Sequence, residues 1–170
     1  GTGFHVHFRL LDETGRNVFD NGTAEGSPVL ARAVAGLLDG MAESTLIFAP
    51  HFNSYRRLRP DTHAPTSVSW GYENRTTALR IPGGDNASRR IEHRVAGADA
   101  NPYLVIATIL GAARYGIETE LCPPAASQGR ASSVRTSKLA AAPVAAVKSF
   151  DAGEVISVVS EGGLLLFCVV

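Results

Sequence analysis

The chain has little cysteine and no long apolar run, the features typical of secreted proteins, structural metal sites and membrane proteins. Only two of its 170 residues are cysteine, Cys122 and Cys168, and they have neither metal-ligand spacing nor the pattern of a disulfide framework. The apolar run at residues 164–170 is far too short to span a bilayer, and no signal peptide is recognised. These absences predict a protein of a reducing compartment, and we expect it to be cytoplasmic with no membrane partner.

A net charge is also missing. The 16 lysines and arginines balance 16 acidic residues, so no overall field attracts nucleic acid. Hydrophobic residues make up 45% and charged residues 19%, which is typical of a globular chain and excludes intrinsic disorder. The length favours a single domain. Because the sequence starts at Gly1, without methionine and inside what reads as a strand, we expect a piece of a longer protein.

Basic residues are nevertheless concentrated in one stretch, residues 53–94. It holds eight of the 16 lysines and arginines, interleaved with apolar side chains, which is typical of guanidinium groups on ordered strands and loops that face an anion. Alternate residues of a strand share a face, so Arg90, Glu92 and Arg94 are predicted to lie on one side. The other side carries Ile91, His93 and Val95. The charged face is either a structural ion-pair ladder or part of an anion-and-metal site.

The first residues alternate like a half-buried strand. One face carries Phe4, Val6, Phe8 and Leu10, and the other carries His5, His7 and Arg9. Two imidazoles on one face can bind a metal, or one can bind the metal while the other contacts a phosphate. The alternative is a strand whose polar residues simply face water.

Helices and strands together predict an α+β fold, with an antiparallel sheet and helices packed on one side. The strands are expected at residues 3–11, 67–70, 76–81 and 89–95, and a further short buried strand at 45–48. Ser27 and Pro28 begin a helix. A second helix begins after Asn101, ends at Gly116, and is apolar on nearly every side, so we expect it to be buried against the sheet.

The C-terminal segment, residues 125–170, differs in its sequence pattern from the rest of the chain. Residues 125–140 lack any periodicity and predict a poorly ordered connection. A short helix is expected over residues 143–150, and the apolar runs at 155–159 and 164–170 are candidate strands.

Five motifs, in order, carry a resemblance to a known family. They are Gly-Thr-Gly-Phe-His-Val-His, Asn-Ser-Tyr-Arg-Arg-Leu, Asn-Arg-Thr-Thr-Ala-Leu-Arg-Ile-Pro, Arg-Ile-Glu-His-Arg and Ala-Asn-Pro-Tyr-Leu. Residues 1–124 resemble the C-terminal portion of the catalytic domain of glutamine synthetases, with residues 125–170 as an atypical tail. The sequence of residues 69–75 most resembles that of the gamma-glutamylpolyamine synthetase-like branch. The resemblance implies that the sheet is part of the family's catalytic barrel and that the complete protein is a homo-oligomeric ring.

The same resemblance implies an activity and a role for each polar residue. In this family ATP phosphorylates the side-chain carboxylate of glutamate, and ammonia or an organic amine displaces the phosphate. Mg²⁺ or Mn²⁺ would be held by His5 and Glu92, and Arg75 would brace the transferred phosphoryl group. The nucleotide phosphates would be contacted by His7, Arg75, Arg80 and Arg90, and the substrate glutamate by Gly1, Arg57 and Arg94. Metal ions and arginines suit this chemistry, because phosphoryl transfer depends on positioning and charge neutralisation.

One departure from the family concerns the flap loop, residues 59–65. Glutamine synthetases carry a glutamate there, whereas this chain has His63. A histidine can act as a catalytic base but supplies no fixed negative charge for ammonium. We therefore expect an organic amine, in contact with Trp70 or Tyr72, to be preferred over ammonia, with a true glutamine synthetase as the alternative.

Two other classes of protein remain as rivals. A truncated relative could bind a nucleotide or another anion without turnover. An RNA-binding protein could use Arg56, Arg57 and Arg59 beside Tyr55 and Trp70. Zero net charge and the lack of a nucleic-acid motif argue against the second, so we expect no nucleic-acid partner.

Overall fold

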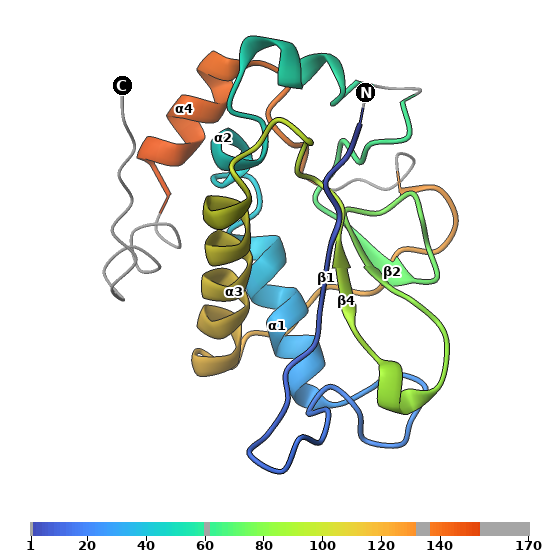
Figure 1. Ribbon diagram of the computed structural model, residues 1–170. Coiled ribbons are helices and arrows are strands. Elements are labelled where there is room, and N and C mark those ends of the chain that lie inside the picture. The colour runs from blue at the N-terminus through green and yellow to red at the C-terminus, as the bar shows by residue number, and fades with distance from the viewer. Residues whose placement is uncertain (1, 60–61, 132–136, 154–170) are drawn as a thin grey trace.

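The structure, a computed structural model, describes residues 2–59, 62–131 and 137–153 (Figure 1). Gly1 and the strands expected at 155–159 and 164–170 lie outside these residues. The elements in chain order are β1 (Val6–Phe8), α1 (Pro28–Asp39), α2 (Thr45–Phe48), η1 (Phe52–Arg56), β2 (Trp70–Tyr72), β3 (Leu79–Ile81), η2 (Asn86–Ser88), β4 (Ile91–His93), α3 (Pro102–Glu118) and α4 (Pro143–Asp151). Figure 1 shows α1 and α3 packed on one side of the strands, which confirms the α+β prediction. None of the helices in the described ranges is long and apolar enough to cross a membrane.

The four strands form one sheet in the order β1-β4-β3-β2. β4 lies antiparallel to β1, with His7 opposite Glu92, and antiparallel to β3, with Arg80 opposite Glu92. β2 and β3, however, run parallel, with Gly71 opposite Arg80. This pairing differs from the antiparallel expectation because the connection between them is not a hairpin. Asn74 closes a local turn, accepting from the Thr76 amide at 3.0 Å, and the chain returns in its original direction.

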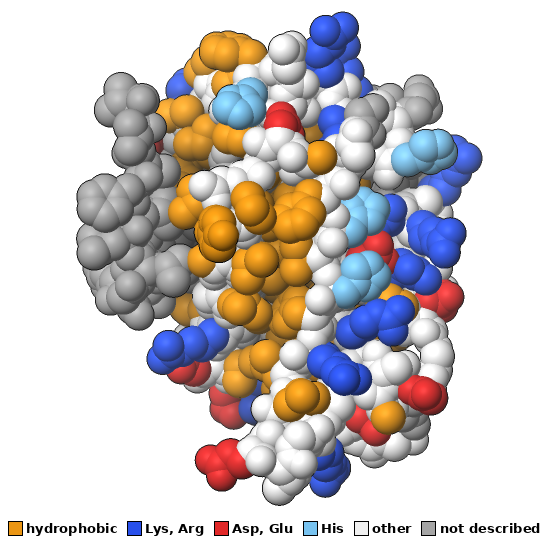
Figure 2. All heavy atoms as spheres, viewed as in Figure 1, with side chains coloured by type: hydrophobic (Ala, Val, Ile, Leu, Met, Phe, Trp, Pro, Cys, Tyr) orange, Lys and Arg blue, Asp and Glu red, His pale blue; other side chains and the backbone are white. Residues whose placement is uncertain are grey.

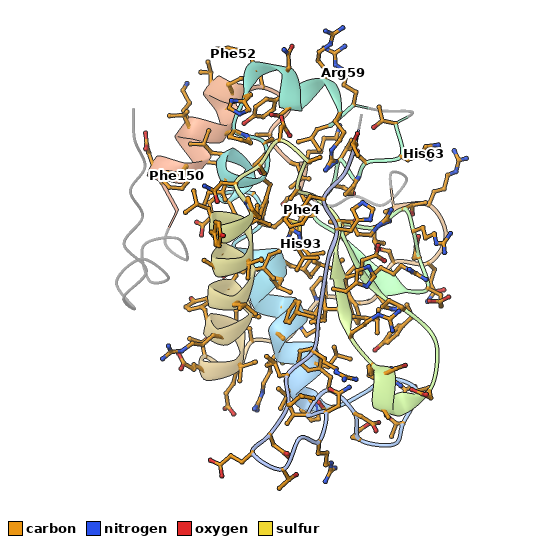
Figure 3. All side chains as sticks on the ribbon, in the orientation of Figure 1. Phe4, Phe52, Arg59, His63, His93 and Phe150 are labelled. Carbon is orange, nitrogen blue, oxygen red and sulfur yellow. The ribbon has the colours of Figure 1, made fainter. Side chains whose placement is uncertain are left out.

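The predicted alternation in β1 and β4 is confirmed. Ile91, His93 and Val95 are buried in the core, and the apolar face of the first strand packs on the same core. Figure 3 shows His93 beside Phe4, on the side of the sheet that faces the helices. The other face of β4 is consequently left for the charged residues.

The two long helices begin where the sequence predicts. Ser27 Oγ accepts from the Leu30 amide at 3.2 Å, and Asn101 Oδ1 accepts from the Tyr103 amide at 3.0 Å. α3 nevertheless continues past Gly116 to Glu118, because Gly116 packs against Gly36 of α1 instead of ending the helix. A Cβ at Gly36 would lie 2.7 Å from Gly116 Cα, so the helix crossing requires glycine at this point.

α3 is exposed on one side and packs on another helix, which corrects the prediction that it is buried against the sheet. It packs mainly on α1, and the described residues leave an apolar stripe exposed at Tyr103, Ile106 and Leu110. Figure 2 shows a broad apolar surface over this part of the molecule. The apolar composition of α3 therefore exceeds what the described part of the chain buries.

Two other segments differ from expectation. Residues 45–48 form the helix α2 and not a strand. A four-residue apolar run fits the period of a helix and that of a strand equally well. The preceding turn, in which Ser44 Oγ donates to Gly40 O at 2.6 Å, starts a helix. Residues 125–140 were expected to form a poorly ordered connection. Of the residues that the structure describes, 125–131 lie beside β2 and 137–140 lie beside residues 66–68, just before β2. The Ser127 amide donates to Trp70 O and the Val68 amide to Ser137 O, each at 2.8 Å. α4 forms where the short helix was predicted.

Candidate functional site

Glu92 is the centre of the charged face of the sheet. Its side chain is buried on β4, and its oxygens meet imidazole or guanidinium groups from both neighbouring strands. His5 Nδ1 and His7 Nε2 lie 3.2 and 3.6 Å from Oε1, and Arg80 Nη1 donates to Oε2 at 2.9 Å. Arg94 Nε lies 3.4 Å from Oε1. Figure 2 shows histidine and basic side chains gathered along this side of the molecule.

This arrangement keeps the carboxylate charged and the first imidazole neutral. Burial alone would raise the pKa of Glu92, but the hydrogen bond from Arg80 and the charge of Arg94 hold that pKa below its ordinary value. Burial and the Arg94 charge lower the pKa of His5, against the opposing pull of Glu92. The close contact of His5 with Glu92 is therefore not an ion pair at neutral pH. A carboxylate and a neutral imidazole are the two forms that bind a divalent metal ion.

The His5–Glu92 pair fits part of the coordination sphere of Mg²⁺ or Mn²⁺. Two ligands of one octahedral ion are about 3 Å apart, which matches the 3.2 Å between His5 Nδ1 and Glu92 Oε1. No group of three ligand side chains arranged for a metal occurs within residues 2–59, 62–131 and 137–153. Mg²⁺ commonly takes only one or two protein ligands and completes its shell with water and phosphates. The pair can thus hold an ion that a phosphorylated ligand also contacts.

Two arginines are fixed by backbone carbonyls beside this pair. Arg57 Nη2 donates to Val95 O and Ala96 O, and Arg94 Nη1 donates to Arg75 O. Arg94 Nε is buried and has no hydrogen-bond partner among the described residues. Burial lowers the pKa of both side chains, yet an arginine stays charged in proteins. The carbonyls therefore hold each guanidinium in place, where its positive charge can attract an anion such as a carboxylate.

A cavity of about 710 Å³ opens beside these residues. It brings together four residues that the sequence singled out, namely His5, Arg57, His63 and Arg94. The rest of its lining is Thr2, Gly3, Asn53, Ser54, Arg56, Thr62, Ala64, Ala98 and Asp99. This volume is in the usual range for a small-molecule site. Figure 3 shows His63 on the flap loop at the outer edge of the molecule.

Other predicted site residues lie near Glu92 but outside the cavity lining. Arg90 Nε donates to His7 Nδ1 at 3.3 Å, which places both at the far end of the charged face. Arg80 is divided between Glu92 and Glu73, with its Nη2 2.9 Å from Glu73 Oε1. Arg75 is exposed, and its carbonyl, not its side chain, contacts Arg94. The charged face therefore extends along the sheet from the cavity towards η2.

The two aromatic residues expected to contact an amine are not in the cavity. Trp70 belongs to the core, where its Nε1 donates to Pro124 O at 2.8 Å. Tyr72 donates to Glu25 O at 2.8 Å and packs edge-on against Trp70. Neither residue lines this cavity, so the expected contact between an amine and Trp70 or Tyr72 stays a prediction.

Asp99 is the residue that sequence reasoning missed. It lines the cavity from the loop between β4 and α3, and Ser54 Oγ donates to its Oδ2 at 2.6 Å. The available signal was a single acid between a strongly charged strand and the helix cap Asn101.

The sequence of the chain also matches a known protein family. Residues 1–160 match the family described as glutamine synthetase, catalytic domain. The chain belongs to the glutamine synthetase family. This confirms the resemblance carried by the five motifs, and the match extends beyond residue 124.

Curated members of the glutamine synthetase family that match the chain include both amine ligases and glutamine synthetases. Gamma-glutamylputrescine synthetase PuuA of Escherichia coli is 48% identical over 121 residues, 71% of this chain and 26% of the relative. Gamma-glutamylethanolamide synthetase GlnA4 of Streptomyces coelicolor is 43% identical over 131 residues, 77% of this chain and 28% of the relative. A glutamine synthetase of Clostridium saccharobutylicum is 39% identical over 127 residues, 74% of this chain and 28% of the relative. The chain thus spans about a quarter of the length of these relatives.

Solved structures agree with the family assignment. The ligand-free structure of GmaS has a TM-score of 0.83 and 31% identity, and covers 95% of this chain and 37% of GmaS. A GmaS/ADP complex has a TM-score of 0.80 at 29% identity, covering 95% of this chain and 41% of that one.

Proposed function

We propose that this chain is part of an ATP-dependent ligase that forms a γ-glutamyl phosphate from glutamate and transfers the glutamyl group to an amine. The observation that carries the proposal is the continuity between the Glu92 cluster and the cavity. His5, whose imidazole is neutral, lines the cavity together with Arg57 and Arg94, and its Nδ1 lies 3.2 Å from the charged carboxylate of Glu92. A metal-bound phosphate and a dicarboxylate can therefore occupy adjacent positions.

In this mechanism the chain binds and orients charged groups. Arg57 and Arg94 bind the carboxylates of glutamate, since arginine forks match carboxylate geometry. His7, Arg80 and Arg90 lie along the charged face towards η2 and bind the nucleotide phosphates, while Arg75 braces the phosphoryl group as it is transferred. His5 and Glu92 would hold Mg²⁺ or Mn²⁺, which would supply positive charge to the phosphate oxygens.

His63 decides the acceptor in this proposal. It lines the cavity in the flap loop and can take a proton from an attacking amine, but it provides no permanent negative charge for ammonium. We infer that an organic amine is the preferred acceptor. Because Trp70 and Tyr72 do not line the cavity, this preference depends on His63 and the loop around it. Glutamine synthesis is the second candidate, favoured by glutamine synthetases among the similar relatives.

The proposal extends to the complete protein. Residues 1–124 form the C-terminal portion of the catalytic domain, with 125–170 as a tail, in a cytoplasmic homo-oligomeric ring that binds neither nucleic acid nor membrane. β1 is an edge strand of the described sheet, and an exposed apolar surface lies beside it (Figure 2). Further strands of the catalytic barrel would pair with that edge and cover that surface.

The test is phosphate release by a full-length ligase that carries this chain in its catalytic domain. The assay supplies ATP, Mg²⁺ or Mn²⁺, glutamate, and either ammonium, putrescine, ethanolamine or isopropylamine. We expect glutamate-dependent release with a higher kcat/KM for an organic amine than for ammonium. A clear preference for ammonium would make the protein a glutamine synthetase, and nucleotide binding without release would make it a non-catalytic relative. The isolated 170-residue chain should bind Mn²⁺–ATP weakly and turn over little, as calorimetry and the same assay can check.

A further inference from the structure

Glu73 has a backbone conformation that is unusual for a glutamate. It follows β2 directly and has a φ of 50°, in the left-handed region that normally favours glycine or asparagine. Its carboxylate offsets the cost of this conformation, because Oε1 accepts from the Gly83 amide and from Arg80 Nη2. A Cβ at Gly83 would lie 3.1 Å from Glu73 Cδ, so the chain after β3 packs closely on this side chain. Two separate contacts therefore hold the carboxylate in one position.

The Glu73 carboxylate is also a charged group. The hydrogen bond from the Gly83 amide, with a smaller contribution from the Arg80 charge, holds the pKa of Glu73 below its ordinary value. Its side chain is nevertheless 59% exposed, and an exposed ion pair contributes little to the stability of a fold. The pair that Glu73 forms with Arg80 is therefore better explained by its effect on the Arg80 guanidinium.

Arg80 uses two different nitrogens for two carboxylates. Nη1 donates to Glu92 Oε2 at 2.9 Å, and Nη2 donates to Glu73 Oε1 at 2.9 Å. Nε is buried and has no hydrogen-bond partner among the described residues. The guanidinium is thus divided between the buried carboxylate of β4 and the exposed carboxylate after β2.

This division affects the oxygen of Glu92 that faces the histidines. An arginine commonly binds a carboxylate through two parallel hydrogen bonds, and such a pair would occupy both oxygens of Glu92. Oε1, however, is the oxygen that lies 3.2 Å from His5 Nδ1, in the pair that fits a divalent ion. A bidentate pair between Arg80 and Glu92 would therefore compete with the ion for Oε1. Both bidentate geometries of an arginine use Nη2, which is the nitrogen that Glu73 holds.

We propose that Glu73 is a positioning residue that keeps Arg80 from binding both oxygens of Glu92 and so leaves Oε1 available to a divalent metal ion. This inference rests on the proposed function, because it takes His5 and Glu92 as the metal-binding pair. It adds a residue that acts on the pair only through Arg80.

The experiment measures Mn²⁺ binding to the full-length ligase by electron paramagnetic resonance, without nucleotide. The binding that is lost in Glu92→Gln defines the site. Glu73→Gln keeps an oxygen for the Gly83 amide and removes the charge, whereas Glu73→Gly removes the side chain and adopts a φ of 50° without strain. We expect the Mn²⁺ affinity to fall by about twofold in Glu73→Gln and by about fivefold in Glu73→Gly, within the range for an exposed ion pair.

Two further variants separate the contact with Arg80 from charge alone. Asp85→Asn removes an exposed charge from the loop between β3 and η2, where Asp85 binds Ser88 and not Arg80, and it should leave the Mn²⁺ affinity unchanged. Lysine carries a point charge and cannot bind a carboxylate bidentately. In an Arg80→Lys background, Glu73→Gly should therefore no longer weaken Mn²⁺ binding. Saturating Mn²⁺ should restore phosphate release by Glu73→Gly to the wild-type kcat.

Three results would overturn the inference. An equal loss of Mn²⁺ affinity in the Arg80 and Arg80→Lys backgrounds would show that Glu73 does not act through Arg80. A Glu73→Gly loss no larger than that of Asp85→Asn would leave Glu73 with a structural role at most, and a wild type that binds no Mn²⁺ would remove the metal-binding pair itself. Failure of the proposed function has a different result, since Mn²⁺ would bind while no amine supports phosphate release. The Mn²⁺ affinities still decide the inference in that case, because they are measured without substrates.

Discussion

Replacing His93 with leucine should remove a large part of the acid sensitivity of the fold. His93 is fully buried behind Glu92, with its ring 4.7 Å from that of Phe48. Burial, with a smaller contribution from the nearby His5, lowers its pKa from 6.5 to about 3. Its Nδ1 has no hydrogen-bond partner in the described part of the chain, so the substitution sacrifices no hydrogen bond there.

Acid destabilises the fold because the pKa of His93 is lower in the folded chain than in the unfolded chain. A histidine with a depressed folded-state pKa is neutral in both states above pH 6.5, and its contribution to stability is fully present there. As pH falls from 6.5 towards 3, the unfolded chain binds a proton that the folded chain cannot, so stability is lost. The loss is about 2 kcal/mol at pH 5 and approaches about 5 kcal/mol near pH 3.

Urea denaturation in EDTA, followed by the fluorescence of the single tryptophan, Trp70, measures this effect. Wild type should lose about 2 kcal/mol more than His93→Leu between pH 8 and pH 5. Ionisation of other groups, Glu92 included, is common to both proteins and cancels in the difference, as does any loss of ring packing with Phe48. Equal losses in the two proteins would refute the assignment of the pH dependence to His93.

Three other outcomes are expected. Gly36→Ala should lower the free energy of unfolding, measured by urea denaturation, by about 2 kcal/mol, because the new Cβ meets the backbone of α3. The control Arg114→Ala, on the exposed side of α3, should lower it by less than about 0.5 kcal/mol. A Gly36→Ala loss no larger than that of the control would disprove the close helix contact. Glu92→Gln should weaken Mn²⁺ binding at least about tenfold, as measured by electron paramagnetic resonance. The control Asp85→Asn, on the loop before β4, should leave the affinity unchanged. A Mn²⁺ affinity of Glu92→Gln equal to that of the wild type would exclude Glu92 as a ligand. The double substitution Ile106→Lys and Leu110→Lys should reduce self-association of the isolated chain in light scattering, and unchanged association would mean that the exposed stripe of α3 is not the contact surface.

The faces of β1 and β4 could be predicted from sequence because the pattern that defines them is local. Alternation in β1 and β4 is sufficient to place Glu92 and His93 on opposite sides, and the caps Ser27 and Asn101 are read from single residues. α2 was missed because a four-residue apolar run has no distinguishable period. The parallel pairing of β2 with β3 depends on a turn at Asn74 and not on either strand.

The cavity was harder to predict because loops far apart in the sequence build it. Asp99 acquires its place from Ser54, and neither residue belongs to a periodic segment. The placement of segment 125–131 could not be predicted for a similar reason, since it depends on the backbone of β2 and on Asn74, whose side-chain amide donates to Ser127 O and Gly129 O.

The side chain of Asn17 has a consequence for how this family can vary in length. Its amide donates to Ala87 O at 3.0 Å and to Arg89 O at 2.8 Å, and so ties down the chain immediately before β4. Inserting or deleting one residue between Arg89 and Glu92 would exchange the two faces of the strand and bring the carboxylate into the core. Insertions before Ala87 leave this anchor in place and lengthen only a surface loop. Natural variation in chain length should therefore accumulate ahead of the anchor, while the strand itself changes by substitution alone.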